Sequence, residues 1–211
     1  MGKIEEKKKE KKQALLEAAF ELYTEKGVDN TSISEIVKQA QMAKGTFYLY
    51  FKDKYEVQNY LIAYHANRIF QNAYERLNHQ SVVTVFTNAE DAVVFLVDSV
   101  IEQLESNLSL MRFISKNLSW GMFSEIQIRD RENRTCLDVF NDILQEYPEK
   151  YRQKELMIYM IVEFVSATCY NVLLNQEPVS VEVLKPEIFQ VIRSILAQFA
   201  ENEKEIQREE V

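Results

Sequence analysis

The sequence predicts an all-α protein. Glycine and proline are scarce, with 4 and 3 occurrences in 211 residues, so the residues that break helices are few. Apolar side chains recur three and four residues apart in most segments, which is the spacing of one helix face. Hydrophobic residues make up 46% and charged residues 27% of the chain, as is typical of a globular protein that buries a core.

The first amphipathic helix is predicted from Ala14 to Tyr23, and Gly27 is expected to end it in the left-handed conformation that glycine adopts without steric cost. The preceding segment, Lys3 to Lys12, alternates lysine with glutamate. It can extend the helix as a solvated end or reach a DNA minor groove as an arm, and the sequence leaves both open. The apolar face consists of Leu15, Ala18, Ala19, Leu22 and Tyr23.

Two short helices separated by a tight turn are predicted next. Ser32 and Glu35 have the spacing of a capping box, which begins a helix. The second helix is expected over Lys44–Phe51, with Phe47 and Phe51 turned inward. Such a pair has the outline of a helix-turn-helix.

A long helix is expected from Asp53, with Glu56 completing a second capping box, to about Leu77. Residues 1–52 would then form a helix-turn-helix domain and residues 53–211 a larger helical domain, with 53–77 as the connecting helix. The prolines are expected at breaks or first turns of helices. The remaining helices are predicted at Asn88–Ser106, Leu108–Lys116, Phe123–Glu146, Tyr151–Asn175 and Val181 to about Arg208.

The segment from Gly45 to Lys54 reads GTFYLYFKDK. With the apolar helix, glycine turn and second helix before it, residues 15–57 resemble the N-terminal domain of the TetR (tetracycline repressor) family. Many positions match in a fixed order, which is more specific than a bare helix-turn-helix outline. The rest of the chain is similar to the family only in length and helical content. The resemblance implies a DNA-binding regulator with a helical domain that dimerises and senses a small molecule.

Two positions differ from the usual family pattern. Gln41 stands where many relatives have glycine, so it is expected to adopt a left-handed conformation. Ala43 stands where many have serine and cannot cap the third helix. Tyrosine, threonine and lysine on the exposed faces of that helix can contact thymine methyl groups or phosphates, while Gly45 would let the backbone approach. The candidate DNA contacts are Ser32, Ser34, Lys44, Gly45, Thr46, Tyr48, Tyr50 and Lys54; the two serines are implied by the resemblance alone.

The net charge of −8 does not exclude DNA binding. Residues 1–56 hold 11 Lys/Arg and 10 Asp/Glu, so the acidic excess lies in the rest of the chain. The charged N-terminus lacks the apolar core of a signal peptide, and Cys136 and Cys169 lack the pattern of a disulfide framework or a zinc site. We therefore expect a cytoplasmic protein without metal or cofactor.

The resemblance also implies that the last two long helices form a dimer interface and that the preceding helices enclose a pocket. Glu163 lies in the apolar run 156–174, where it favours a helix buried in protein over one in lipid. Its carboxylate can meet a cationic ligand, an arginine such as Arg112, Arg129 or Arg134, or the rim of a dimer interface. The candidate ligand contacts are Phe113, Asn117, Trp120, Phe123, Tyr159, Glu163 and Tyr170.

The function that these observations favour is repression: a homodimer binds a palindromic operator on double-stranded DNA, and a small molecule releases it. Two alternatives from other classes remain. An enzyme is disfavoured because His65 and His79 are the only histidines and lie near no nucleophile or metal-ligand pattern. A helical protein-interaction module without DNA binding would leave the tyrosine-bearing third helix unexplained.

Overall fold

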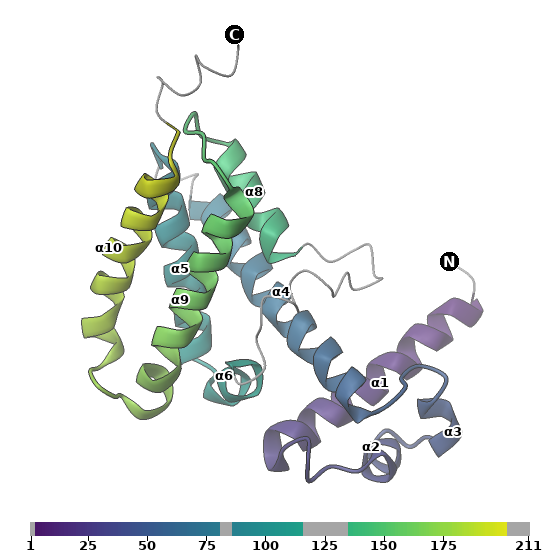
Figure 1. The fold of residues 1–211 in the computed structure, drawn as a ribbon. Helices are drawn as coiled ribbons and strands as arrows, with labels where there is room; N and C mark the ends of the chain where they lie inside the picture. The colour runs from purple at the N-terminus through teal and green to yellow at the C-terminus, as the bar shows by residue number, and fades with distance from the viewer. Residues whose placement is uncertain (1–2, 81–85, 116–134, 202–211) are drawn as a thin grey trace.

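The computed structural model of the chain describes residues 3–80, 86–115 and 135–201, and their repeating structure is helical throughout (Figure 1). This confirms the predicted fold class. The helices are α1 (Lys3–Lys26), α2 (Ile33–Gln39), α3 (Lys44–Phe47), α4 (Lys54–Gln80), α5 (Ala89–Glu105), α6 (Leu108–Ser115), α8 (Cys136–Gln145), α9 (Lys154–Asn175) and α10 (Val181–Phe199).

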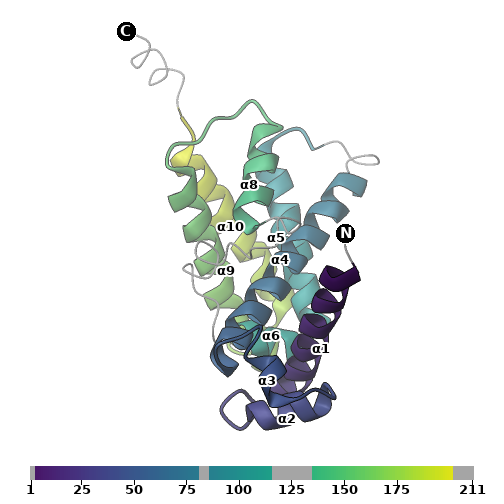
Figure 2. The same cartoon turned by 90° about the vertical axis from the view of Figure 1, so that its right-hand side faces the viewer.

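Helices α1, α2 and α3 form a small group at one end of the molecule (Figure 2). Leu15 and Ala19 of α1, Ile36 of α2 and Phe47 of α3 are fully buried against one another. Helix α1 begins at Lys3, so the lysine- and glutamate-rich segment is an extension of the helix in this structure. The capping box at Ser32, the left-handed Gly27 and the inward Phe47 and Phe51 agree with the sequence prediction.

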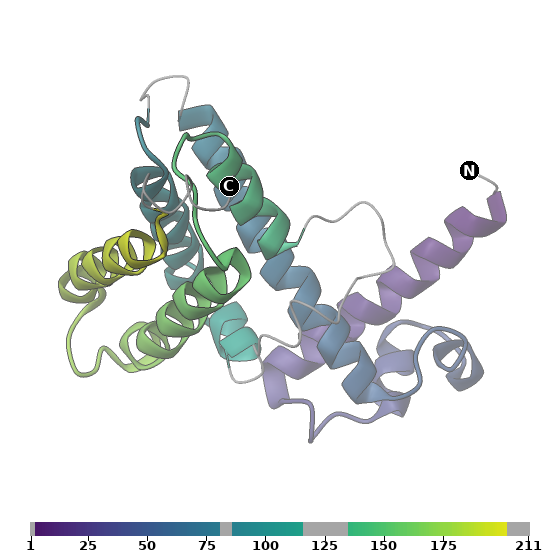
Figure 3. The same cartoon turned by 45° about the horizontal axis from the view of Figure 1, so that its top comes forward.

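Helix α4 runs from this group into a bundle made of α5, α6, α8, α9 and α10 (Figures 1 and 3). It packs on α1 at its beginning and on α5 and α8 farther along. Helices α9 and α10 form a hairpin at the far side of the bundle. One continuous helix therefore belongs to both the N-terminal group and the bundle.

Three predicted boundaries in the larger helical domain were wrong. The helix expected over Phe123–Glu146 begins at Cys136, because the Thr135 hydroxyl caps it, and residues 116–134 lie outside the described residues. The last helix ends at Phe199 and does not continue to Arg208, because Ala200 is extended and pairs with Tyr151 in an isolated β-bridge. The same bridge keeps Tyr151 out of α9.

Helix α9 is long and apolar enough to cross a membrane by length and composition. In this structure it packs against α10, α6 and α8. Its buried residues Val162, Val165 and Cys169 follow one stripe, and its exposed residues Leu156, Tyr159 and Met160 follow another. The helix therefore has two apolar sides, one inside the bundle and one outside.

Candidate DNA-binding site and ligand cavity

The start of α2 is held by a closed set of hydrogen bonds. The Ser32 N–H donates to Glu35 Oε2 at 2.8 Å, and the Glu35 N–H donates to Ser32 Oγ at 3.2 Å. The Lys26 ammonium also donates to the Glu35 carboxylate and, with the Ser32 N–H, lowers its pKa to about 2. Ser32 is thus occupied as the helix cap, while Ser34 is exposed in the first turn of α2.

The turn between α2 and α3 ends α2 in a Schellman motif. The Met42 N–H donates to the Val37 carbonyl at 2.8 Å and the Gln41 N–H to the Lys38 carbonyl at 3.1 Å. Gln41 has a φ of 54° and Ala43 makes no side-chain cap, as the sequence predicted. Gln41 thus places a side chain at the left-handed position after α2, where glycine is the usual residue.

Helix α3 is shorter than predicted, because after Phe47 the chain tightens into i→i+3 hydrogen bonds. The Leu49 N–H donates to the Thr46 carbonyl at 3.2 Å, and the Tyr50 N–H to the Phe47 carbonyl at 3.0 Å. As a result Leu49 is 80% exposed and Tyr48 53% exposed, whereas Tyr50 is half-buried against the core. Thr46 is half-buried as well.

Leu49 is not among the DNA contacts predicted from the sequence, because an apolar residue between two tyrosines is usually expected to lie in the core. The signal that could have found it is its position two residues after the buried Phe47, which places it on the opposite side of a helical turn. Together with the exposed Lys44, Gly45 and Tyr48, it makes up the outward surface of α3 and its following turn.

Gly45 has no role inside the chain that requires glycine. A Cβ added there would meet no atom within 4 Å, and its φ is not in the left-handed region. Glycine costs about 1 kcal/mol relative to alanine within a helix. An open position of this kind, exposed beside Tyr48 and Leu49, leaves room for the approach of another molecule.

Lys54 is placed differently from the other candidates. Its ammonium donates to the carbonyl oxygens of Val28, Asp29 and Thr31 at 2.8, 3.0 and 3.1 Å. It is half-buried and joins the turn after α1 to the start of α4. The structure thus brings the candidates around α2 and α3 into one region but turns Lys54 toward the protein.

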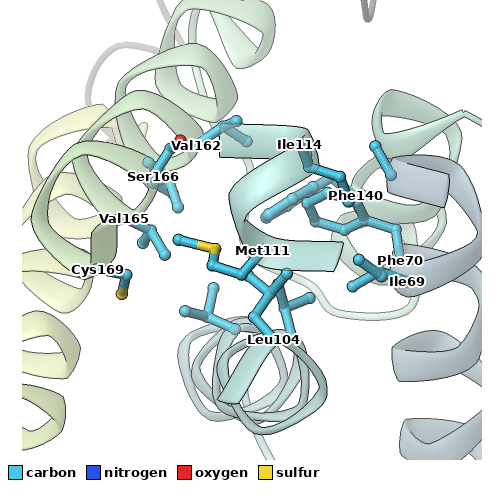
Figure 4. A pocket seen from close by; sticks show the side chains of 14 residues that line it. Ile69, Phe70, Leu104, Met111, Ile114, Phe140, Val162, Val165, Ser166 and Cys169 are labelled. Atoms are coloured by element: carbon cyan, nitrogen blue, oxygen red, sulfur yellow. The ribbon is translucent and has the colours of Figure 1, made fainter. Parts of the chain in front are cut away.

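Inside the bundle, α4, α5, α6, α8 and α9 enclose a cavity of about 60 Å³ (Figure 4). Met111 reaches from α6 toward Val165 of α9, and Phe140 closes the side toward α4. Ser166 and Cys169 carry the polar side-chain atoms of the lining, and burial raises the pKa of the Cys169 thiol to about 11, so it stays neutral. The remaining lining residues are Ala66, Ile69, Phe70, Val97, Val100, Leu104, Ile114, Ile161 and Val162.

None of the predicted ligand contacts that the structure describes lines this cavity. Phe113 points toward α1, with ring centroids 5.4 Å from Phe20 and 6.3 Å from Tyr23. Phe113 and Tyr170 instead line a separate cleft of about 520 Å³ between the N-terminal helices and the bundle, together with Arg112. Tyr159 and Glu163 belong to the outer stripe of α9, and Asn117, Trp120 and Phe123 lie outside the described residues.

Periodicity alone cannot identify the residues that line the cavity. It shows which residues share a face, but α9 is apolar on both sides, so the pattern does not tell which face borders empty space. The residues that do line the cavity are ordinary aliphatic core residues in the sequence, and only the relative placement of five helices turns them into a lining.

The described residues combine an N-terminal helix-turn-helix with a helical bundle around an apolar cavity, which is the architecture expected of a helix-turn-helix regulator. Residues 15–60 match the family model described as bacterial regulatory proteins, tetR family. The chain is 57% identical over 44 residues to the HTH-type transcriptional regulator YvdT of Bacillus subtilis, a match that covers 21% of this chain and 23% of that protein. It is 41% identical over 54 residues to a regulator of Staphylococcus aureus strain USA300, across 26% and 29% of the two chains. The chain thus spans less than a third of the length of these curated relatives.

Solved structures extend the likeness to most of the chain. A TetR transcriptional regulator from Rhodococcus matches with a TM-score of 0.62 and 19% identity, over 89% of this chain and 96% of that one. FadR from Bacillus subtilis, solved in complex with stearoyl-CoA, matches with a TM-score of 0.59 and 19% identity, over 85% and 96%. FadR from Thermus thermophilus, in complex with lauroyl-CoA, matches with a TM-score of 0.59 and 17% identity, over 87% and 92%. At these identities the likeness establishes the fold. Residues 15–60 thus resemble the tetR family of bacterial regulatory proteins, and the chain as a whole shares its fold with solved members of that family.

Proposed function

We propose that the protein is a cytoplasmic transcriptional repressor that binds a palindromic operator as a homodimer and is released by a small apolar ligand. The observation that carries the proposal is the outward surface of α3, where Lys44, Gly45, Tyr48 and Leu49 are exposed over the buried Phe47. Tyrosine and leucine can contact thymine methyl groups in a major groove, and lysine can neutralise a phosphate.

The outer side of the α9–α10 hairpin supports dimerisation with a second copy of the chain. Leu156, Tyr159 and Met160 on α9 are exposed, as are Val183 and Val191 on the neighbouring α10. Isologous pairing of this surface would cover these apolar side chains. It would also present two α3 surfaces to half-sites about 34 Å apart, which is one turn of DNA.

The cavity supports a ligand whose buried portion is uncharged and rich in hydrocarbon. Among the described residues that line it, the neutral Cys169 thiol is the only ionisable side chain, so a buried charge would find no partner among them. Two proteins of the same fold were solved with acyl-CoA molecules, which carry long hydrocarbon chains. Glu163 does not line this cavity, which favours its placement at the rim of a dimer interface over contact with a cationic ligand.

The size of the cavity supports release by a ligand. The free space of about 60 Å³ has room for a few waters, so we expect a bound acyl chain to displace the surrounding helices. Ala66, Ile69 and Phe70 of α4 line the cavity, and α4 also carries the N-terminal helices. Displacement of α4 would change the spacing of the two α3 surfaces in a dimer.

The first experiment selects bound sequences from random duplex DNA and then measures affinity at several salt concentrations. Enrichment of a palindrome is expected, with loss of binding in Tyr48→Ala and partial retention in Tyr48→Phe. Lys44→Met should reduce the slope of log affinity against log salt by about 0.9, whereas Lys150→Met, an exposed lysine before α9, should not. Absence of enrichment would favour the interaction-module alternative.

The ligand is tested with lauroyl-CoA and free CoA on the selected operator. Lauroyl-CoA should lower operator affinity, and CoA alone should not. A cavity-filling variant, Val165→Phe, should keep DNA binding and lose the response. Unchanged operator affinity at saturating lauroyl-CoA would contradict an acyl chain as the ligand. Unchanged operator affinity while any apolar ligand is bound would contradict ligand-induced release from DNA.

A further inference from the structure

We infer that Lys54 is a positioning residue that fixes the helix-turn-helix on α4, and that it does not contact a DNA phosphate; this inference rests on the proposed DNA binding. The Lys54 ammonium lies among three backbone carbonyl oxygens of the turn after α1. Its Nζ is 2.8 Å from the Val28 oxygen, 3.0 Å from that of Asp29 and 3.1 Å from that of Thr31.

The hydrogen-bonding capacity of Lys54 is used up by these contacts. A lysine ammonium has three N–H donors and no acceptor, and each of the three donors has a carbonyl partner here. A phosphate oxygen could bind only by displacing a carbonyl, which would then lose its charged donor. Lys44, by contrast, is exposed on the outward surface of α3.

The backbone of Lys54 is held as well. The Tyr23 hydroxyl donates to the Lys54 carbonyl oxygen at 2.8 Å, and Tyr23 is only 4% exposed. Burial raises the pKa of Tyr23 far above its usual value, so the hydroxyl keeps its proton. The carbonyl of Lys54 is thus bound to the end of α1, and its ammonium is bound to the following turn.

The turn that Lys54 holds leads directly into α2. Thr31 is buried and its hydroxyl donates to the Gly27 carbonyl at 2.8 Å, which shapes the turn. The next residue, Ser32, is the N-cap of α2, and α2 packs on α3. The Lys54 clamp, meaning Lys54 with its three carbonyl partners and Tyr23, therefore sets the angle at which α2 and α3 project from α4.

The test compares Lys54→Met, Lys54→Arg and Lys44→Met for operator affinity across salt concentrations and for thermal unfolding. Lys54→Met should lower operator affinity about tenfold or more with an unchanged salt slope. Lys54→Arg keeps the charge, but its planar guanidinium does not fit three converging carbonyls, so it should fail to restore affinity. Lys44→Met should reduce the slope by about 0.9 and leave the melting temperature unchanged.

Thermal unfolding separates failure of this inference from failure of the proposed function. Both Lys54 variants should melt below the wild type, whether or not the protein binds DNA. If the wild-type protein binds no operator, the proposed function is wrong. The melting temperatures of the Lys54 variants then still test whether the Lys54 clamp stabilises the fold. A reduced salt slope in Lys54→Met, or wild-type affinity and melting temperature in Lys54→Arg, would overturn the inference.

Discussion

His65 of α4 faces α1, with its ring centroid 4.3 Å from that of Phe20 and with Glu17 and Arg68 lining the same pocket. Burial, and to a smaller extent Arg68, lowers its pKa to about 4 from 6.5. Because the folded state resists protonation, the contribution of neutral His65 is complete above pH 6.5 and is lost as the pH falls toward 4. We expect a loss of about 2 kcal/mol over this window, after discounting for partial exposure.

Urea unfolding at pH 7.0, 5.5 and 4.5 checks this expectation in wild type and His65→Gln. As the pH is lowered, the free energy of unfolding should decrease less in the variant than in the wild type. The difference between the two decreases should be about 2 kcal/mol over the window. Carboxylates titrate in both proteins and cancel in the difference. Parallel curves would contradict a buried neutral His65, and the NMR titration of its ring gives the pKa directly.

Leu49 should read thymine methyl groups if α3 enters a major groove. Replacing thymine by uracil at the contacted position removes one methyl group, worth about 0.8 kcal/mol when buried, or roughly a fourfold loss of affinity. Leu49→Ala should bind both operators equally well. Binding that is insensitive to uracil at every operator thymine in the wild-type protein would show that Leu49 does not face the bases.

At the scale of the element, the turn between α2 and α3 carries a removable strain. Gln41 occupies the left-handed position of a Schellman motif, which costs a residue with a side chain about 1 kcal/mol. Gln41→Gly should therefore raise the free energy of unfolding by about 0.5–1 kcal/mol. Lys38→Gly, at an exposed position within α2, should lower it by a similar amount; equal effects of the two substitutions would refute the expectation.

The ends of the elements show what local chemistry can and cannot predict. Asp53 caps α4 as expected, accepting from the Tyr55 and Glu56 N–H groups at 2.9 Å. The Glu56 carboxylate, however, accepts from the Lys52 N–H, so the predicted capping box is only half right. Caps depend on neighbours in sequence and are predictable, whereas the end of α10 depends on Tyr151, far away in sequence.

At the scale of the whole molecule, the fold class and the helix-turn-helix could be predicted because periodicity, caps and a dense local motif determine them. The lining of the apolar cavity could not be predicted, since it comes from five helices whose relative placement leaves no mark in local patterns. Lys54 illustrates the same limit at one residue. Its charge suggested a phosphate, and only the folded turn supplies the three carbonyl groups.

The proposed dimer predicts that charge on the outer side of the hairpin separates the two copies. Met160→Glu and Val183→Glu each place a carboxylate where an apolar side chain is exposed in the single chain. Sedimentation should show a shift from dimer to monomer, because an unpaired buried charge is costly. Leu108→Glu, at an equally exposed leucine on α6, is the matched control and should leave the mass unchanged.

The pairing of Tyr151 with Ala200 also has a consequence for hydrogen exchange. The Arg152 N–H donates to the Phe199 carbonyl at 2.9 Å and the Glu201 N–H to the Lys150 carbonyl at 2.8 Å, so two amides outside any helix are protected. Each can exchange with solvent only when the segment after α10 separates from the segment before α9. Their exchange rates therefore report the opening of this end of the hairpin, and they should slow as protein concentration rises if a second copy closes over it.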